Sequence, residues 1–281
     1  MAAISAADVK ALRERTGVSL GDCKKALVDA DGDQKRAIEI LRERGEAIQL
    51  KRGDRATSFG RFGLYVGLDK TVGAMVELKC ESAPVAGNQE FCQLADDLAQ
   101  QYALTPEATT PDDLLALPSP SKEGMTLGEQ KDDLFNRIRE VFKIGRMVRH
   151  ETPCNGYFHN SGTIAGVLVS VEGGNDQAVC DIAMHIAAMQ PEALSRDEIC
   201  SERAEQERKF LTEQVVKSGK PEQFADKIVE GQMRKFFGDC VLLEQPFVKD
   251  DSQTVEKFAQ SQEMKILAYS RWEIGQEEGE D

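Results

Sequence analysis

The chain of 281 residues carries 49 acidic and 35 basic side chains, and its formal net charge is −14. This length suggests about two domains and is sufficient to bury a hydrophobic core without disulfide bonds or metals. The charge argues against a general nucleic-acid-binding protein and against a protein of anionic membranes, because both need basic surfaces. The longest apolar stretch, Ile164–Val169, is too short to span a bilayer.

The sequence contains neither a recognisable targeting peptide nor a disulfide pattern. The N-terminus, Met1–Ser5, has neither a basic flank nor an apolar core, so it predicts no signal or transit peptide. The 7 cysteines are widely spaced and include no C-x-x-C pair, which is typical of reduced thiols rather than of a disulfide framework. We therefore expect a cytoplasmic protein that binds no metal or cofactor.

Residues 1–45 predict a small unit of three short helices. Ser5 can cap the first helix, Asp22 opens the second, and Asp33 can cap the third. Each helix has apolar residues at helical spacing, so the three can share one small core. The charged residues 46–58 that follow predict a linker.

From residue 59 the hydrophobic period changes from 3.6 toward 2, which predicts strands. Two strands, 61–66 and 72–80, should form a hairpin, and a helix should follow it. A proline-rich surface loop at 106–120 and a helical stretch at 127–148 complete a core N-terminal subdomain over 59–150.

The same pattern recurs in the core C-terminal subdomain, residues 151–272. A second hairpin at 156–171 precedes a helix at 176–189, and a last strand is predicted from Met264. The hairpins are too short for crossover connections, so we expect an α+β fold of two related subdomains with antiparallel sheets. Residues 273–281 are acidic and predict a disordered tail.

Two charged helices at about 203–237 interrupt the second subdomain. Gly219 and Pro221 separate them, as expected for an antiparallel helical hairpin. Two interpretations stay open: a solvated arm whose helices pair with each other, and an exposed coiled-coil arm offered to a partner. The apolar stripe of the pair consists of Phe210, Leu211, Val215, Phe224, Ile228 and Met233.

Motifs of common enzyme classes are missing from the sequence, including the P-loop, G-x-G-x-x-G, H-E-x-x-H and G-x-S-x-G patterns. His150, Cys154 and His159 form the one cluster of metal-binding residue types, but a fourth ligand is not evident. We therefore predict no catalytic residue and no metal ligand, and an interaction protein rather than an enzyme. An enzyme that uses His185 or this cluster is the weakest alternative.

Several motifs occur in the order and spacing of a known translation factor. They are Arg15–Gly17, Asp22–Leu27, Ala37–Arg42, Val76–Cys80, Ile182–Ala187, Ser218–Pro221, Lys227–Phe236 and Gln245–Val248. Together they cover almost the whole chain, and the chain resembles the elongation factor Ts family, the guanine-nucleotide exchange factors for elongation factor Tu. The resemblance implies an N-terminal ubiquitin-associated-like domain, a core of two related subdomains, and an antiparallel coiled-coil arm.

The resemblance also implies a surface that binds GDP-bound elongation factor Tu. The N-terminal domain would face the partner's GTPase domain, and the core would reach the nucleotide site and disturb its phosphate loop and magnesium. The implied partner-binding residues are Arg13, Leu20, Lys24, Ala165, Gly166, His185, Phe247 and Val248. For His185 the alternative is packing on its own helix, and for Ala165 and Gly166 it is packing within a sheet.

Residues 81–86 depart from the family's pattern. The family's usual loop is Gln or Glu followed by Thr-Asp-Phe-Val-Ala, and its Asp and Phe are credited with dislodging the partner's magnesium. The corresponding loop here consists of Ser82, Ala83, Pro84 and Val85. Ala83 has no carboxylate, which excludes displacement by charge at this position. We expect Pro84 and Val85 to form a rigid apolar wedge instead, because proline restricts the backbone angle φ.

The sequence therefore predicts a translation elongation factor that promotes GDP release from elongation factor Tu and allows GTP to bind. The alternative is a binding or scaffold protein of the same fold without exchange activity, which the altered loop makes conceivable. We expect no direct binding of nucleic acid or membranes. The stoichiometry stays open, with a homodimer and a 2:2 complex among the alternatives.

Overall fold

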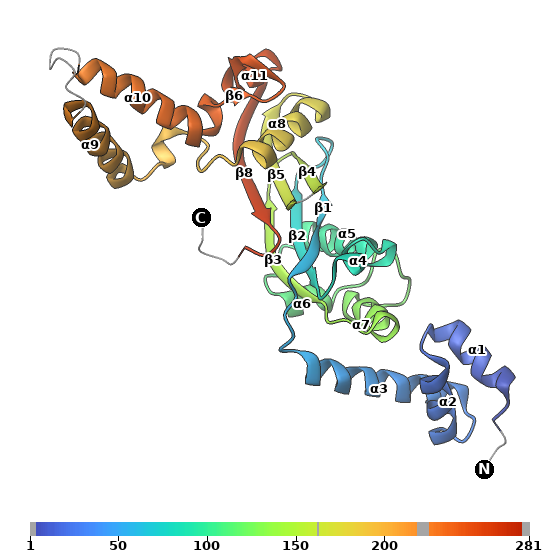
Figure 1. The fold of residues 1–281 in the computed structure, drawn as a ribbon. Helices are drawn as coiled ribbons and strands as arrows, with labels where there is room; N and C mark the ends of the chain where they lie inside the picture. The colour runs from blue at the N-terminus through green and yellow to red at the C-terminus, as the bar shows by residue number, and fades with distance from the viewer. Residues whose placement is uncertain (1–3, 162, 218–224, 277–281) are drawn as a thin grey trace. The chain divides into compact units, whose positions relative to one another are not determined.

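The computed structural model describes residues 4–161, 163–217 and 225–276, which form a mixed fold of helices and antiparallel strand pairs (Figure 1). The predicted turn between the two arm helices and residues 277–281 of the predicted acidic tail lie outside the described residues. None of the described helices combines the length and the hydrophobicity that crossing a membrane requires.

The chain divides into two compact units. The first unit comprises Met1–Tyr65 and Ala74–Arg149, and the second comprises Val66–Gly73 and His150–Asp281. Each unit contains one three-stranded sheet with its own helices and its own hydrophobic core.

Three helices begin the first unit: α1 (Ala6–Thr16), α2 (Leu20–Asp29) and α3 (Gln34–Arg52). The side chains of Ser5, Ser19 and Asp33 accept hydrogen bonds from backbone N–H groups in the first turns of α1, α2 and α3, respectively. The predicted caps at Ser5 and Asp33 are therefore confirmed, and α2 begins two residues before Asp22. Leu12, Leu27 and Ala37 are fully buried in the shared core of these helices. Because α3 continues to Arg52, the first half of the predicted linker is helical.

The first sheet has the strand order β1-β2-β3. Its strands are β1 (Phe59–Tyr65), β2 (Gly73–Cys80) and β3 (Lys143–His150). β1 and β2 are antiparallel, with Phe62 opposite Glu77, so the predicted hairpin is confirmed. The middle strand β2 is buried along nearly its whole length.

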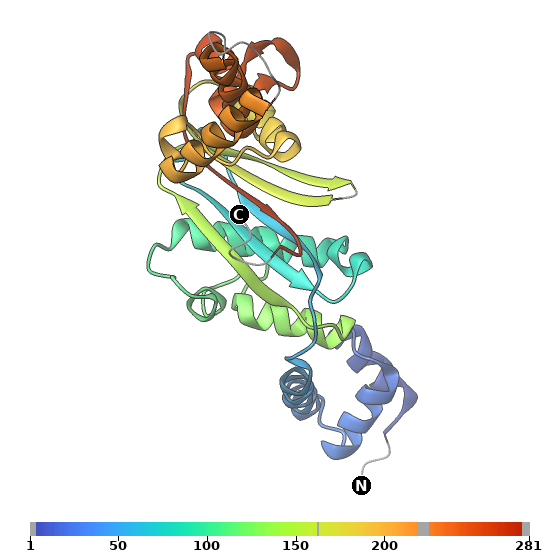
Figure 2. The same ribbon diagram turned by 60° about the vertical axis from the view of Figure 1, so that its left-hand side comes forward.

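Four helices separate β2 from β3: α4 (Ala83–Ala86), α5 (Gln89–Leu104), α6 (Pro111–Leu115) and α7 (Leu127–Ile138). α5 packs on β1, and α7 packs on α5 (Figure 2). Val76 and Leu78 of β2 contribute to one core with Phe91, Leu94 and Leu98 of α5. α6 lies within the predicted proline-rich loop, where Thr110 caps it.

The predicted helical stretch 127–148 is wrong in its second half. α7 ends at Ile138, because Arg139 adopts the left-handed conformation with φ of 68° and its N–H bonds the carbonyl of Phe135. The chain then enters β3, which supplies β2 with its second neighbour. Short apolar segments fit a helix and a buried strand equally well, so periodicity could not distinguish the two.

The second sheet has the strand order β4-β5-β8. Its strands are β4 (Cys154–Ser161), β5 (Thr163–Gly173) and β8 (Met264–Glu273). α8 (Asp176–Met189) packs on β4 and β5. The predicted second hairpin, its helix and the last strand are thus confirmed. Alternate residues Val167, Val169 and Val171 of β5 enter one core with Ile182 and Ile186 of α8.

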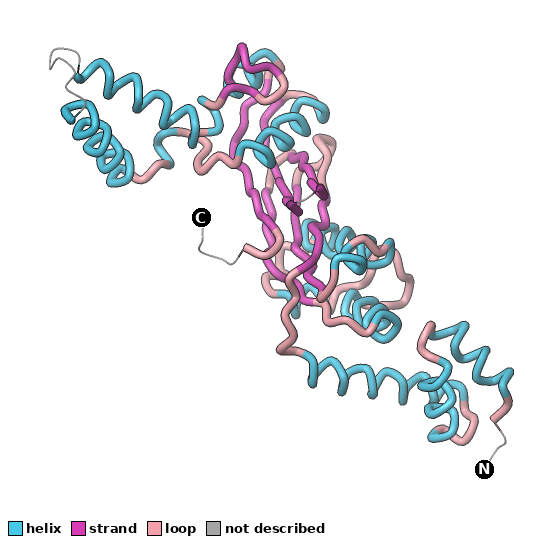
Figure 3. The backbone as a smooth tube through the Cα atoms, in the orientation of Figure 1, coloured by secondary structure: helices cyan, strands magenta, loops and turns pink. Residues whose placement is uncertain are grey.

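Two further helices, α9 (Ser201–Lys217) and α10 (Ala225–Cys240), pack along each other (Figure 3). Leu211 and Val215 of α9 are buried with Val229 and Met233 of α10. Phe210 is 54% exposed, so its predicted place in the apolar stripe is wrong. The chain then forms β6 (Pro246–Phe247), β7 (Asp250–Thr254) and α11 (Val255–Ser261) before β8.

A buried ion pair on β2 and β3 generates a stability prediction. The side chain of Glu77 is fully buried, and its carboxylate accepts hydrogen bonds from Nε and Nη2 of Arg146, each at 3.1 Å. Glu77→Ala removes the carboxylate that compensates the buried guanidinium. We expect it to lower the free energy of unfolding by about 3–5 kcal/mol in urea denaturation.

The matched control is Glu39→Ala, which removes an exposed ion pair with Arg36. It should change the free energy of unfolding by less than about 1 kcal/mol. Equal effects of the two substitutions would contradict the role assigned to burial.

Candidate functional site

The N-terminal helices present an apolar and cationic stripe. Leu20 and Val28 of α2 are each 49% exposed, and Lys24 lies exposed between them. Residues four apart share one face of a helix, so these three side chains form one continuous surface, here called the α2 stripe. Arg13 on α1 is exposed as well.

The turn after β2 presents only part of the predicted wedge. Ala83 and Pro84 are exposed in the first turn of α4, and Ser82 precedes them. Val85 is only 9% exposed and packs in the core of the first unit with Phe91. The prediction that Val85 forms part of an exposed wedge is therefore wrong, because this side chain anchors the turn. Pro84 and Ala83 supply its exposed apolar surface.

The two residues that follow α7 contact helix α2 and the turn after β2. Nη2 of Arg139 donates to Oδ2 of Asp22 on α2 at 3.1 Å. Oγ of Ser82 donates to Oε1 of Glu140 at 2.6 Å. Two consecutive residues therefore connect helix α2 with the turn at Ser82. Sequence reasoning missed both, since an arginine in the left-handed conformation after a helix has no characteristic sequence signal.

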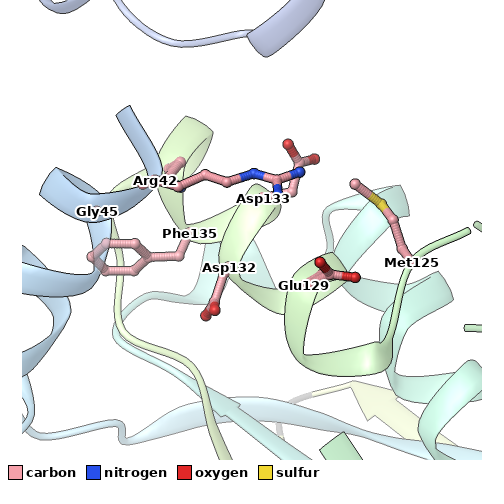
Figure 4. A pocket seen from close by; sticks show the side chains of 8 residues that line it. Arg42, Gly45, Met125, Glu129, Asp132, Asp133 and Phe135 are labelled. Carbon is pink, nitrogen blue, oxygen red and sulfur yellow. The ribbon is translucent and has the colours of Figure 1, made fainter. Parts of the chain in front are cut away.

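A small cavity of about 130 Å³ lies where α3 packs on α7 (Figure 4). Its volume is below that of typical ligand pockets, about 300–1,000 Å³. A Cβ atom on Gly45 would overlap the side-chain amide of Asn136, so a larger residue here would have to displace that side chain. The cavity therefore marks helix packing rather than a nucleotide site. It is lined by Arg42, Gly45, Met125, Glu129, Asp132, Asp133, Phe135 and Asn136.

In the second unit, His185 is fully buried on α8. Its Nε2 lies 2.9 Å from Oε1 of Gln245, and its Nδ1 lies 3.1 Å from the backbone N of Val248. Phe247 is also buried, and its ring stacks on Phe258 with centroids 4.2 Å apart. Val248 is 48% exposed. Of the predicted residues His185, Phe247 and Val248, only Val248 presents its side chain at the surface.

A second contact from α8 holds the same turn. Nζ of Lys249 lies 2.7 Å from Oδ1 of Asp181, and Asp181 precedes His185 by one helical turn. α8 thus fixes the chain on both sides of the Val248 side chain.

Ala165 and Gly166 lie in the middle strand β5 and are buried. Ala165 is opposite His159 of β4, and Gly166 is opposite Trp272 of β8. Both residues therefore lie in a strand that is paired on both sides, and neither is exposed at the surface.

The cluster around Cys154 is held by hydroxyl groups. Nδ1 of His150 lies 2.9 Å from Oγ of Ser170, and its Nε2 lies 3.1 Å from Oγ of Ser270. Nδ1 of His159 lies 3.1 Å from the hydroxyl oxygen of Tyr157 on the same strand. Within the part of the chain that the structure describes, no three His, Cys, Asp or Glu side chains are placed to hold a metal ion.

Comparison with known proteins gives a consistent result. The family model described as "Elongation factor TS" matches residues 84–276. The chain is 37% identical to "Elongation factor Ts" of Hydrogenovibrio crunogenus, which covers 98% of this chain and 92% of that protein. It is 38% identical to the protein of the same name from Alkalilimnicola ehrlichii, over 98% and 93% of the two chains. For the Kineococcus radiotolerans protein the identity is 39%, over 98% and 100%.

Burial of His185 generates a prediction on pH dependence. Burial lowers the pKa of His185, and its hydrogen bond with Gln245 opposes this shift only in part. Below the ordinary histidine pKa of about 6.5, the unfolded chain therefore binds more protons than the folded chain. The free energy of unfolding should fall as the pH falls below about 6.5, by at most ~1.4 kcal/mol per pH unit for this group.

Urea denaturation at about pH 7.5 and about pH 5.5 checks this expectation. His185→Asn should reduce the loss of stability on the acid side. Part of the loss should remain, because burial also lowers the pKa of His150. An unchanged acid-side loss in His185→Asn would contradict the prediction.

Proposed function

Because the chain belongs to the elongation factor Ts family, we propose that this translation elongation factor is a guanine-nucleotide exchange factor for elongation factor Tu. It binds the GDP-bound partner in the cytoplasm, disturbs the magnesium and phosphate site, and promotes GDP release so that GTP can bind. No covalent bond changes in this process, so the protein acts as a binding protein rather than an enzyme and uses no cofactor.

Exchange by this mechanism is a coupling between two ligands of elongation factor Tu. If the factor weakens GDP binding, GDP weakens binding of the factor by the same ratio. A coupling of about 4 kcal/mol, at ~1.4 kcal/mol per decade, corresponds to a roughly thousandfold change in affinity. When the change falls mainly on the dissociation rate, GDP release accelerates by a similar factor.

The observation that carries the proposal is the arrangement of exposed residues in the first unit. The α2 stripe offers an apolar and cationic surface that suits the partner's GTPase domain, as expected of a ubiquitin-associated-like domain. Ala83 and Pro84 offer a second apolar surface, and Arg139 and Glu140 contact the elements that bear the two. One contact to each of these elements would let binding energy at α2 act through the turn on the nucleotide site.

The second unit supplies further contacts in this proposal. Val248 provides an exposed apolar side chain, while His185 and Phe247 support it from within. The pair of helices α9 and α10 serves as a coiled-coil arm toward a partner. A homodimer and a 2:2 complex are both compatible with such an arm.

A scaffold protein without exchange activity is the second candidate. It is favoured by Ala83 and Pro84, which lack the carboxylate and the large aromatic ring of the family's usual loop. In that case the α2 stripe would bind elongation factor Tu without loss of nucleotide affinity.

Release of a fluorescent GDP analogue from purified elongation factor Tu at fixed magnesium separates the two candidates. Acceleration by sub-stoichiometric amounts of this protein is the expected result for an exchange factor. Binding without acceleration would favour the scaffold. Absence of binding would refute both.

The α2 stripe generates a prediction on affinity. Leu20→Ala removes a half-exposed apolar side chain from this surface and should weaken binding to GDP-bound elongation factor Tu by about 1–2 kcal/mol, roughly 5- to 30-fold. Lys25→Ala, an exposed position outside the stripe on the same helix, is the matched control. Isothermal titration calorimetry measures both, and an equal loss in the two variants would argue against the stripe.

The turn after β2 generates a prediction on rate. Pro84→Gly removes an exposed apolar ring and the restriction on φ, so it should slow nucleotide release at saturating factor by about tenfold, or about 1.4 kcal/mol. Pro111→Gly, in the first turn of α6, is the matched control and should leave the rate unchanged. A wild-type rate in Pro84→Gly would show that the other contacts suffice.

A further inference from the structure

Gln245 is a buried polar residue at the junction of three elements. It is 1% exposed, lies immediately before β6, and faces both α8 and α10. Burying an amide is costly unless its donors and acceptors are paired, so its partners constrain its orientation strongly.

The NH₂ group of Gln245 faces the ends of two helices. Its Nε2 donates to the carbonyl of Asp239 at 2.7 Å and lies 3.5 Å from the carbonyl of Met189. These carbonyls belong to the last turns of α10 and α8, where intrahelical donors run out. Carbonyl groups only accept hydrogen bonds, so the NH₂ group must lie on this side and Oε1 must face His185.

This orientation determines which nitrogen of His185 carries the proton. Oε1 of Gln245 can only accept, so Nε2 of His185 at 2.9 Å must be the donor. A neutral imidazole then has a lone pair on Nδ1, which accepts the backbone N–H of Val248 at 3.1 Å. The chain of hydrogen bonds is consistent from both ends, because a backbone N–H can only donate.

We propose that Gln245 is a positioning residue for partner binding, which acts through the Nε2–H tautomer of His185 to hold the exposed side chain of Val248 in its binding orientation. The identity of the partner rests on the proposed function, whereas the role of Gln245 rests on the hydrogen-bond distances given above. The same amide caps α10, so it also ties the base of the helix pair α9 and α10 to the Val248 turn.

The tautomer can be measured without a partner. The chain has only 3 histidines, and ¹⁵N chemical shifts of selectively labelled imidazoles distinguish protonated from unprotonated nitrogens. In the wild-type protein we expect a protonated Nε2 and an unprotonated Nδ1 for His185. Gln245→Ala should abolish this preference. A protonated Nδ1 in the wild-type protein would overturn the proposal even if every variant failed to fold.

The positioning role is measured by binding to GDP-bound elongation factor Tu. Gln245→Ala should weaken binding about fivefold, the effect of one neutral hydrogen bond. Combined with Val248→Ala, it should add less than about twofold, because the presented side chain is already lost. Combined with Leu20→Ala it should retain its full effect, since Leu20 belongs to the other unit.

Two outcomes overturn the role of Gln245: wild-type affinity in Gln245→Ala, and an undiminished fivefold loss in the Val248→Ala background. Both leave the proposed function intact, because the wild-type protein still binds. Absence of binding by the wild-type protein refutes the proposed function and the positioning role together, while the imidazole shifts decide the tautomer on their own.

Discussion

Each of the two three-stranded sheets depends on a third strand that arrives late in the chain. A two-stranded hairpin is at best marginally stable in water, and both β1-β2 and β4-β5 are hairpins. β3 completes the first sheet and β8 completes the second, in each case by pairing with the strand that then becomes central. These long-range pairings give the middle strands β2 and β5 a hydrogen-bonded neighbour on each side.

The return of the third strand also places the exposed surfaces. In the first unit, the path back to β3 carries Arg139 and Glu140 past Asp22 and Ser82. In the second unit, the helices α9 and α10 are inserted between α8 and the strand β8, which pairs with β5. The segments before α9 and after α10 lie side by side, because Ala193 and Val241 form a backbone bridge. The segments that lead back to β3 and β8 therefore make these contacts between distant parts of each unit.

Two histidines of the second unit differ in what their hydrogen bonds specify. His185 and Gln245 pair with each other, and each uses its remaining capacity on the backbone. His150 lies between two serine hydroxyls, which can donate or accept and so do not select a tautomer. Only the first of these arrangements therefore specifies the position of an exposed side chain, Val248.

The sequence by itself determined the local elements and the family. Hydrophobic period, caps and turn residues located both hairpins, helix α8 and strand β8, because these signals act over a few residues. The colinear motifs identified the family, because each of them is also a pattern of a few consecutive residues. Tertiary structure alone decided that 143–150 is a strand and that Val85 and His185 point inward. It also decided that Arg139 bonds Asp22, that Glu140 bonds Ser82 and that Gln245 bonds His185. Each of these depends on contacts between residues distant in the chain, which local periodicity does not encode.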